Sequence, residues 1–336
     1  MREPTFWYRP PSWISRLLAP FGAIYGAVTA QRMTRDGASA GLPVLCVGNY
    51  HVGGAGKTPA TLALVKLLRE MGEKPFVVSR GYGGSQQGPV RVDHLAHTAS
   101  DVGDEPLMMT SSVPVIVSRD RVAGAAMARA QGASVVLLDD GFQNPALAKD
   151  ASLIVIDAGR GVGNGGVFPA GPLRAPLESQ IARTDALIVI GTGDAANDIA
   201  ARVLRQGSPV LRARLVPDEV SVDKLRGQRV LAFAGIGDPA RFFATLRACG
   251  VDVAGERSFA DHHPFTPDEL GQLVSDAASQ SLMLLTTEKD MARIRSDARF
   301  RDQANGIATF PVTLDFDDAA MLRNFVAERL AKARAR

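Results

Sequence analysis

The stretch HVGGAGKTPATL (residues 51–62) decides the fold, because it has the form of a phosphate-binding loop that runs into a helix. The usual pattern is glycine, four residues and then Gly-Lys-Ser/Thr, and Gly56–Thr58 supplies its second half. His51 stands where the first glycine is expected. The apolar run at 43–49 predicts a buried strand before the loop, and apolar residues at helical spacing follow the loop. Strand, loop and helix in this order are the setting that a phosphate loop requires.

Such a loop holds phosphate with successive backbone N–H groups at the N-terminus of a helix. Its three glycines allow a tight, partly left-handed backbone, and His51 lies where the chain leaves the strand and a side chain can point away. Lys57 is expected to reach the β- and γ-phosphates and the Thr58 hydroxyl to bind Mg²⁺. The alternative is a glycine-rich turn without a ligand, which the Lys-Thr pair disfavours. The candidate nucleotide-binding residues are His51, Val52, Gly53, Gly54, Ala55, Gly56, Lys57 and Thr58.

A second motif, VVLLDDGFQ at 135–143, predicts the metal side of the same site. An apolar strand that ends in a carboxylate is the usual second half of a phosphate-loop site. A pair of aspartates at a strand end can also be a helix cap or a turn, but its combination with the loop favours Mg²⁺. The candidate metal ligands are Thr58, Asp139, Asp140 and, as a supporting polar group, Gln143.

The fold class is α/β. Near-continuous Val/Ile/Leu runs alternate with helical stretches such as 120–131, which indicates a P-loop NTPase-like, mostly parallel sheet with helices on both faces. Further buried strands are predicted at 74–79, 113–118, 134–139, 152–157 and 186–191.

A second, smaller α/β series begins near residue 228, with strands at 229–236, 282–287 and 308–312, a helix around 239–249 and a charged C-terminal helix. Residues 207–228 have strand-like runs but no helix pattern. The predicted organisation is a membrane-associating helix at 1–35, a P-loop domain at 36–206, a connection at 207–228 and a C-terminal α/β domain at 229–336.

The composition is that of a globular protein with a full core, with 46% hydrophobic and 22% charged residues among 336. The two cysteines, Cys46 and Cys249, are far apart and lack the spacing of a disulfide or metal site, which predicts buried free thiols in a cytosolic protein. A net charge of +3 without a basic stripe argues against nucleic-acid binding.

The N-terminus is apolar over residues 12–30 and is flanked by arginines. Its uncharged part, 17–30, would be about 21 Å long as a helix, which is short for a hydrocarbon core of about 30 Å. A signal peptide would export the phosphate loop away from ATP, so we discount it. A helix packed on its own core is the alternative, but Trp13, Tyr25 and the arginines favour an anchor that lies in the plane of a membrane.

Several motifs together resemble one family. In order, the sequence contains VGNYHVGGAGKTP (47–59), SRGYGG (79–84), GDEP (103–106), LLDDGFQ (137–143), GNGGVFPAGPLR (163–174), AFAGIGDPARFF (232–243), ADHH (260–263) and TTEKD (286–290). This ordered set is similar to the tetraacyldisaccharide 4′-kinases, the lipid A kinases of Gram-negative bacteria, and covers nearly the whole chain. That family's phosphate loop also lacks the first glycine, so His51 is no obstacle to nucleotide binding.

The resemblance implies that the γ-phosphoryl group of ATP passes to the 4′-hydroxyl of a tetraacyl glucosamine disaccharide 1-phosphate, with Mg²⁺ as cofactor. It points to Asp104 as the acceptor of the hydroxyl proton, assisted by His262, with Lys57 and Asp139 as the other catalytic residues. Asp104 can instead begin a helix, and His262 can be a surface histidine. His263 competes with His262, and Asp261 is expected to orient the ring.

Asn49, Arg80 and Arg174 are the candidate contacts to substrate or phosphate. Asn49 can instead bind the loop itself, and surface ion pairs are the alternative for the arginines. Two departures from the family pattern concern substrate contacts. Ala175 stands where the family usually has Glu, a role that falls to Glu178 if it exists, and Asn144 stands where it usually has His.

The expected partners are ATP, the acylated disaccharide 1-phosphate and a membrane surface, at the cytoplasmic face of the bacterial inner membrane. The rival hypotheses are a soluble P-loop small-molecule kinase or synthetase and a GTPase-type metallochaperone. The first has no use for an apolar segment at 12–30. The second needs a guanine-specifying motif with one residue between Lys and Asp, and in TTEKD these two residues are adjacent.

Overall fold

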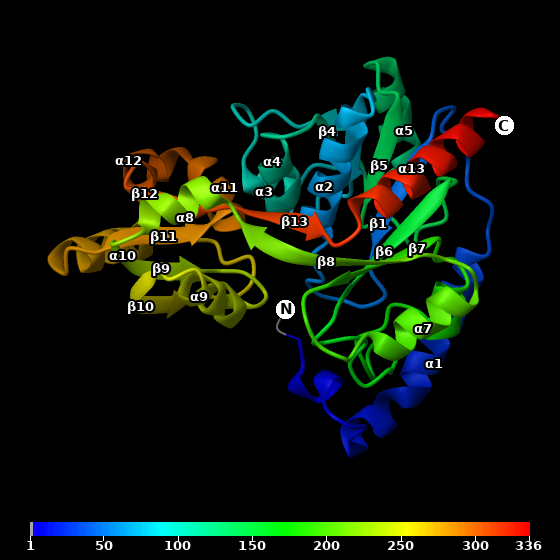
Figure 1. Ribbon diagram of the computed structural model, residues 1–336, viewed down its shortest axis with the longest axis horizontal. Coiled ribbons are helices and arrows are strands. Elements are labelled where there is room, and N and C mark those ends of the chain that lie inside the picture. Colours follow the sequence, from blue (N-terminus) through cyan, green and yellow to red (C-terminus); the bar gives the residue numbers. More distant parts are fainter. Residues whose placement is uncertain (1–2) are drawn as a thin grey trace.

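The computed structural model describes residues 3–336, which form two units side by side (Figure 1). The large unit contains a nine-stranded sheet in the order β13-β8-β7-β6-β1-β5-β2-β4-β3, and the small unit a four-stranded sheet in the order β10-β9-β11-β12. The strands are β1 (Val44–Gly48), β2 (Pro75–Ser79), β3 (Val90–Arg91), β4 (Val115–Val117), β5 (Val135–Asp139), β6 (Ala151–Asp157), β7 (Ala186–Ile190), β8 (Val210–Pro217), β9 (Arg229–Ala234), β10 (Asp252–Ser258), β11 (Met283–Thr287), β12 (Ile307–Phe310) and β13 (Val312–Phe316). The helices are α1 (Trp13–Met33), α2 (Lys57–Glu70), α3 (Ala99–Val102), α4 (Asp104–Met109), α5 (Arg121–Ala130), α6 (Leu177–Ile181), α7 (Asn197–Arg205), α8 (Glu219–Leu225), α9 (Pro239–Ala248), α10 (Pro267–Ser279), α11 (Glu288–Arg295), α12 (Arg301–Ala304) and α13 (Ala319–Arg334), with short 3₁₀ turns at Thr5–Tyr8 and Ala298–Phe300.

The predicted fold class is confirmed. Six neighbouring strands of the large sheet, in the order β4-β2-β5-β1-β6-β7, pair in parallel. They are buried along their whole length, as their continuous apolar runs require. Helices α2, α4 and α13 pack into the core on one face, and α5, α6 and α7 into the core on the other. All nine strands predicted from apolar runs exist, with boundaries within two residues of the expected ones.

The organisation of the chain differs from the expectation in two places. Residues 207–228, expected to be a connection without a helix, contain β8 and α8, and β8 is a strand of the large sheet. The last strand and helix, β13 and α13, also belong to the large unit, where β13 pairs antiparallel with β8. The small unit (residues 218–311) is therefore inserted into the large unit (3–217 and 312–336), and β8 and β13 link the two (Figure 1).

The sequence of β8 lacks the continuous apolar run that marks the central strands of the large sheet. Leu211 and Ala213 are buried, whereas Arg212 and Arg214 alternate with them, and Arg214 is exposed. This period-2 pattern is typical of a strand near a sheet edge and differs from the continuous apolar runs of the central strands.

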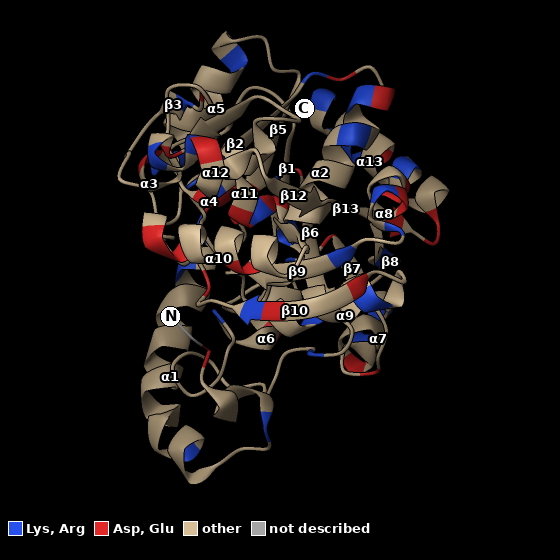
Figure 2. Ribbon diagram, turned by 90° about the vertical axis from the view of Figure 1, so that its left-hand side faces the viewer, with Lys and Arg blue, Asp and Glu red and all other residues tan. Residues whose placement is uncertain are grey.

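The apolar N-terminal segment forms α1, which begins after a capping box at Ser12 and runs to Met33. Its glycines face the large unit: a Cβ added at Gly22 would lie 2.7 Å from the carbonyl oxygen of Val167, and one at Gly26 would lie 3.3 Å from Pro176. The side of α1 that carries these glycines packs closely against the large unit, so the opposite side of the helix faces outward. Figure 2 shows that α1 has almost no charged residues. Among the described residues, no helix has the length and apolar character needed to cross a bilayer.

Candidate active site

The phosphate loop connects β1 to α2 at the carboxyl end of a central strand. Gly56 caps α2 with φ of 88°, a left-handed conformation that favours glycine. A Cβ at this position would also lie 2.7 Å from Cδ1 of Ile190, so both conformation and space require glycine. Lys57 is the first residue of α2, which places the loop N–H groups and the lysine at one helix N-terminus.

His51 replaces the first glycine of the pattern without strain. Its backbone lies outside the left-handed region and forms an antiparallel bridge with Leu173. Its side chain is only 1% exposed and its Nδ1 lies 2.9 Å from the carbonyl oxygen of Val52. Burial lowers the pKa of His51 to about 4, so the ring is neutral at pH 7. The position is therefore a structural one, covered by the chain around Leu173.

Asp139 ends β5 beside β1, where Val47 is its register partner. It is 1% exposed, and its Oδ2 accepts a hydrogen bond of 3.3 Å from the Ser79 hydroxyl, whereas its Oδ1 has no partner among the residues that the structure describes. Burial raises the pKa of this carboxyl to about 7, and the nearby Glu105 carboxylate adds to the shift. A buried carboxylate oxygen without a donor fits a site for a cation.

Asp140 is differently placed, although it is the next residue. Arg174 Nη1 donates to both of its oxygens, at 2.9 and 3.1 Å, and Lys57 Nζ lies 3.7 Å away. Burial would raise the pKa of Asp140, but these two cations hold it below its usual range. Asp140 is thus an ionised anchor for Lys57 and Arg174.

Three predicted ligand residues brace the loop. Asn49 Nδ2 donates to the carbonyl oxygen of Gly53 at 3.1 Å, and Gln143 Nε2 donates to the carbonyl oxygen of Asn49 at 2.8 Å. Arg174 Nε donates to the carbonyl oxygen of His51 at 3.0 Å. The contact of Asn49 with the loop is one of its two predicted roles. Gln143 and Arg174 also bind loop backbone, and their metal and substrate roles stay predictions. Arg80, in contrast, is exposed directly after β2 and has no ion pair within the described part of the chain.

Asp104 and His262 meet across the two units, 158 positions apart in sequence. Asp104 is the first residue of α4 and is 5% exposed, and His262 follows β10. Nδ1 of His262 lies 3.0 Å from Oδ2 and 3.2 Å from Oδ1 of Asp104. Burial would raise the pKa of Asp104, but the hydrogen bond from His262 and the charges of Lys289 and Arg293 hold it well below its usual range.

The neighbours of His262 have separate contacts. Nε2 of His263 binds the carboxylate of Glu269 at 3.0 Å, and its ring stacks on Phe259, so this histidine is part of the packing of the small unit. Asp261 Oδ2 lies 3.7 Å from Nε2 of His262, on the side of the ring away from Asp104.

Sequence reasoning gave no role to several residues at this contact. Lys289 Nζ lies 3.2 Å from the carboxylate of Glu105 and 3.7 Å from that of Asp104, and Arg293 also binds Asp104. Lys289 lies within TTEKD, and Glu105 within GDEP, so the motifs contained a signal that was not assigned. Arg293 lies outside every motif.

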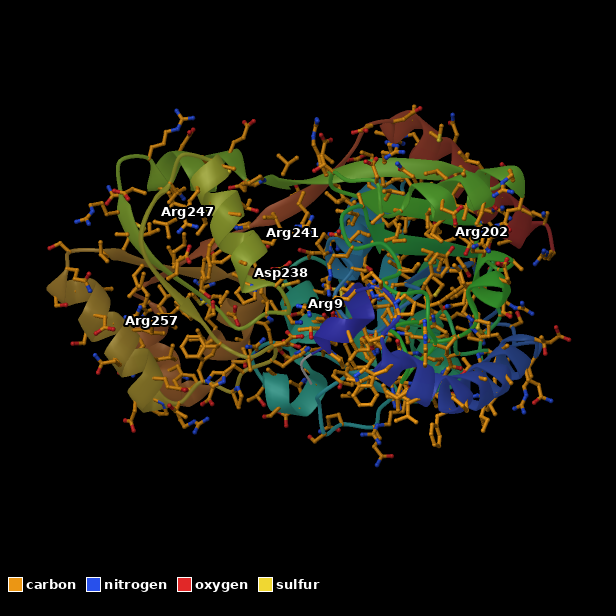
Figure 3. The ribbon with its side chains drawn as sticks, turned by 90° about the horizontal axis from the view of Figure 1, so that it is seen from below. Arg9, Arg202, Asp238, Arg241, Arg247 and Arg257 are labelled. Atoms are coloured by element: carbon orange, nitrogen blue, oxygen red, sulfur yellow. The ribbon has the colours of Figure 1, made fainter. Side chains whose placement is uncertain are left out.

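A second contact between the units lies beside the site. Arg241, near the start of α9, forms an ion pair with Asp157 at the end of β6. Figure 3 shows Arg241 and Asp238 on the side of the small unit that faces the large unit, whereas Arg247 and Arg257 lie farther from it.

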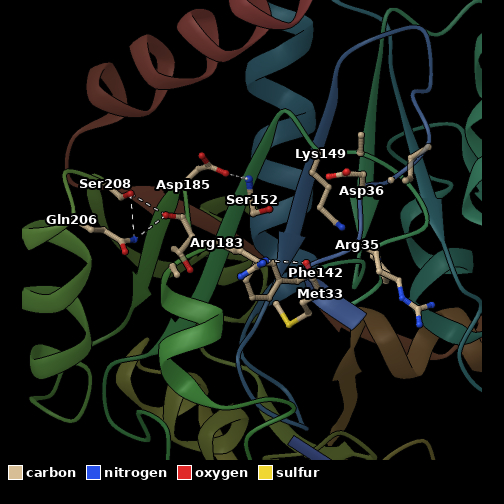
Figure 4. A pocket seen from close by; sticks show the side chains of 16 residues that line it. Met33, Arg35, Asp36, Phe142, Lys149, Ser152, Arg183, Asp185, Gln206 and Ser208 are labelled. Atoms are coloured by element: carbon tan, nitrogen blue, oxygen red, sulfur yellow. Dashed lines mark hydrogen bonds between the residues drawn. The ribbon is translucent and has the colours of Figure 1, made fainter. Parts of the chain in front are cut away.

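A pocket of about 560 Å³ lies at the opposite edge of the large sheet, where Lys149, Ser152, Asp185 and Ser208 stand at the amino ends of β6, β7 and β8 (Figure 4). Two of its cations bind backbone carbonyl oxygens: Lys149 binds that of Asn144 at 2.6 Å, and Arg183 that of Met33 at 2.9 Å. The pocket is therefore separate from the phosphate loop.

A loop built to hold the phosphates of a nucleotide thus stands near a pair, completed by the other unit, that is suited to take a proton from a hydroxyl. The combination of a phosphate loop with a proton-accepting pair defines an ATP-dependent phosphotransferase of the P-loop class.

The family follows from comparison with known proteins. Residues 14–331 match the family model described as Tetraacyldisaccharide-1-P 4'-kinase. The chain is 63% identical over 336 residues to the tetraacyldisaccharide 4′-kinase of Rhodopseudomonas palustris (strain BisB5), with 100% of this chain and 99% of the relative covered. It is 62% identical over 336 residues to that of Bradyrhizobium diazoefficiens, with 100% and 98% covered. The chain belongs to the tetraacyldisaccharide 4′-kinase family, as the sequence motifs predicted.

A solved structure agrees with this assignment. The "apo" form of LpxK from Aquifex aeolicus in complex with ATP is similar over 94% of this chain and 99% of that chain, with a TM-score of 0.73 and 26% identity. The protein is an ATP-dependent kinase, and the small-molecule synthetase and metallochaperone hypotheses are not favoured.

Proposed function

We propose that this kinase transfers the γ-phosphoryl group of ATP to the 4′-hydroxyl of a tetraacyl glucosamine disaccharide 1-phosphate at the surface of a membrane, with Mg²⁺ as cofactor. The observation that carries the proposal is the Asp104–His262 pair, which is completed only where the two units meet. Labelled ATP and the disaccharide in detergent micelles give the direct test. Label at the 4′ position is expected, and failure of a folded, ATP-binding protein to transfer it would refute the proposal.

The residues have distinct proposed roles. Loop N–H groups and Lys57 hold the phosphates of ATP and neutralise charge on the group in transfer. Asp140 and Arg174 fix the position of Lys57 and the loop. The Asp104–His262 pair accepts the proton of the acceptor hydroxyl, with Asp104 supplying a carboxylate that its neighbours keep ionised. Arg80, which is exposed, is the best remaining partner for a phosphate of ATP or of the lipid.

Thr58 and Asp139 would hold Mg²⁺, because the Oδ1 atom of Asp139 is buried without a donor and Thr58 follows Lys57 in the loop. When bound, the ion supplies positive charge to the phosphate oxygens. Asp140 contributes less directly to Mg²⁺ binding, because both of its carboxylate oxygens already accept hydrogen bonds from Arg174.

Asp139→Asn tests the metal role. The exchange keeps the shape of the side chain but removes its negative charge, so the Mg²⁺ concentration for half-maximal rate should rise and turnover should fall by about a hundredfold. Mg²⁺ titration of the phosphoryl-transfer rate measures both effects. Asp150→Asn, near the amino end of β6, is the matched control and should leave the titration unchanged. An unchanged titration in Asp139→Asn would move the metal role to another residue.

The membrane role is proposed from the outward face of α1. Its apolar side chains at intervals of three and four residues lie on one face of a helix, and Trp13, Leu17, Phe21, Ile24 and Val28 are between 52% and 73% exposed. Exposed arginines, including Arg16 and Arg32, lie near the two ends of the helix. An uncovered apolar stripe between cations is typical of a helix that lies in the interface of an anionic bilayer. This placement corresponds to the cytoplasmic face of the inner membrane, where ATP is available.

The double variant Phe21→Asp/Ile24→Asp tests this placement. Each exposed side chain is worth about 1.5–3 kcal/mol on full burial, so two acidic replacements should weaken vesicle binding by roughly a hundredfold or more. Sedimentation with vesicles that contain anionic phospholipid measures the effect. Leu204→Asp/Val220→Asp makes the same charge change at residues that are 57% and 61% exposed outside α1, and should bind as the native protein does. Equal binding by both double variants would exclude α1 as the anchor.

A further inference from the structure

Arg293 of α11 joins three groups of the active-site contact. Its Nη2 donates to Oδ2 of Asp104 at 2.7 Å, across the contact between the units. Its Nη1 donates to Oδ1 of Asp290 at 2.9 Å and to the carbonyl oxygen of His263 at 3.1 Å. The side chain is only 10% exposed. A guanidinium group bound at both terminal nitrogens has a fixed orientation, which a lysine ammonium group would not have.

The far side of Arg293 is anchored on fully buried structure. Asp290 is 0% exposed and accepts hydrogen bonds from the backbone N–H of Gly235 at 3.0 Å and from the Thr287 hydroxyl at 2.7 Å. Gly235 directly follows β9 and also accepts a hydrogen bond of 3.1 Å from the backbone N–H of His262. The same glycine therefore anchors both Arg293, through Asp290, and the backbone of the catalytic histidine.

These contacts close a ring through both units: Gly235, Asp290, Arg293, Asp104, His262 and back to Gly235. Within the ring His262 has φ of 59°, a left-handed conformation that is uncommon for a residue with a Cβ and that supporting contacts help to maintain. The ring of contacts supplies that support, because His262 is held at its backbone by Gly235 and at its Nδ1 atom by Asp104.

We propose that Arg293 is a positioning residue for phosphoryl transfer: it holds the Asp104 carboxylate, and through it the His262 ring, in the orientation that accepts the proton of the acceptor hydroxyl. The inference rests on the proposed role of the Asp104–His262 pair. Lys289 has a different part, since its Nζ lies 3.7 Å from Asp104 and 3.2 Å from Glu105, which supplies charge without a fixed direction. Of the two cations, Arg293 and Lys289, only Arg293 therefore fixes the orientation of the Asp104–His262 pair.

Arg293→Lys is the first test, because it retains the positive charge opposite the buried Asp290 and loses the two-nitrogen fork. Turnover should fall by about a hundredfold, as expected for a displaced catalytic group, while the KM for ATP stays within about twofold. Initial rates at saturating lipid and the melting temperature are the measurements. Arg247→Ala is the control, on an arginine of α9 that is 55% exposed and pairs with Glu256 within the small unit, and it should leave turnover unchanged.

Arg293→Ala provides a second readout that a merely structural role would not give. Added guanidinium ion should restore part of the turnover, methylammonium should restore little, and Arg247→Ala should respond to neither. A folded Arg293→Lys variant with turnover within about twofold of native would overturn the proposal, as would a folded Arg293→Ala variant whose loss of turnover guanidinium does not relieve.

A third comparison separates this inference from the proposed function. In an Asp104→Ala background, Arg293→Lys should cost almost nothing further, because the residue that it orients is gone. If Asp104→Ala itself keeps native turnover, the role of the pair fails and this inference fails with it. If Asp104→Ala loses turnover and Arg293→Lys costs the same factor in both backgrounds, only the positioning role is refuted.

Discussion

Replacement of Lys57 by alanine is expected to lower turnover by about a thousandfold and to leave the protein folded. Lys57 is the first residue of α2, and in the proposed site its ammonium group contacts the transferred phosphoryl group, where its charge is needed most in the transition state. The fold should persist because Asp140 keeps its second cation, Arg174, at 2.9 Å. Initial rates with labelled ATP and a thermal melt measure the two effects.

Lys66→Ala is the matched control for this experiment. Lys66 lies in the same helix but is exposed, so its removal should change neither rate nor melting temperature measurably. Turnover of Lys57→Ala within a few-fold of the native protein would mean that the loop does not hold the reacting phosphates.

The second large effect is expected at the Asp104–His262 pair. Asp104→Ala and His262→Ala should each lower turnover by about a thousandfold, and the double variant should be little worse than the more damaging single one, because the two residues act as one unit. ATP affinity should persist in all three variants, since neither residue belongs to the phosphate loop. Losses that multiply in the double variant would instead assign independent roles, and the acceptor proton would need a different base.

The pH profile tests the same pair. A group that accepts a proton must be unprotonated, so the rate should rise with pH through an apparent pKa that belongs to the pair. The hydrogen bond from His262 is the largest of the influences that hold the pKa of Asp104 below its usual range, so removal of His262 should raise the pKa of this carboxyl and change the position of the limb. A limb that stays in place in His262→Ala would exclude the histidine from proton acceptance.

The centre of the fold, and the positions of the loop and of Asp139 at strand ends, could be predicted from sequence, whereas the supporting contacts could not. A buried strand between two helical layers is a continuous apolar run, and the loop at 51–58 has a fixed spacing, so both are local signals. The bonds from Gln143 to Gln180, at 2.9 Å, and from Arg293 to Asp104 join residues far apart in the chain. No local pattern specifies such partners, because they depend on how the elements pack.

The two departures from the family pattern, Ala175 and Asn144, also take part in contacts that depend on how the elements pack. Ala175 is fully buried and its carbonyl oxygen accepts a hydrogen bond of 2.8 Å from Gln180, so this position belongs to the support of the loop. Glu178, considered as a substitute acid, forms an ion pair with Arg202 at the surface. Asn144 accepts from the backbone N–H of Ala146 at 2.9 Å and from Lys149 through its carbonyl oxygen.

The insertion of the small unit sets an order for the synthesis of the protein. Helix α2, which carries Lys57, shares its core with Leu314, Leu322 and Phe325 of β13 and α13. A ribosome that has translated the phosphate loop, both aspartates and His262 has still not made the strand and helix that cover α2. The small unit is continuous in sequence and can fold first, while the large unit must wait for the end of translation. A chain that stops after residue 311 would contain every candidate catalytic residue and still lack a finished nucleotide site.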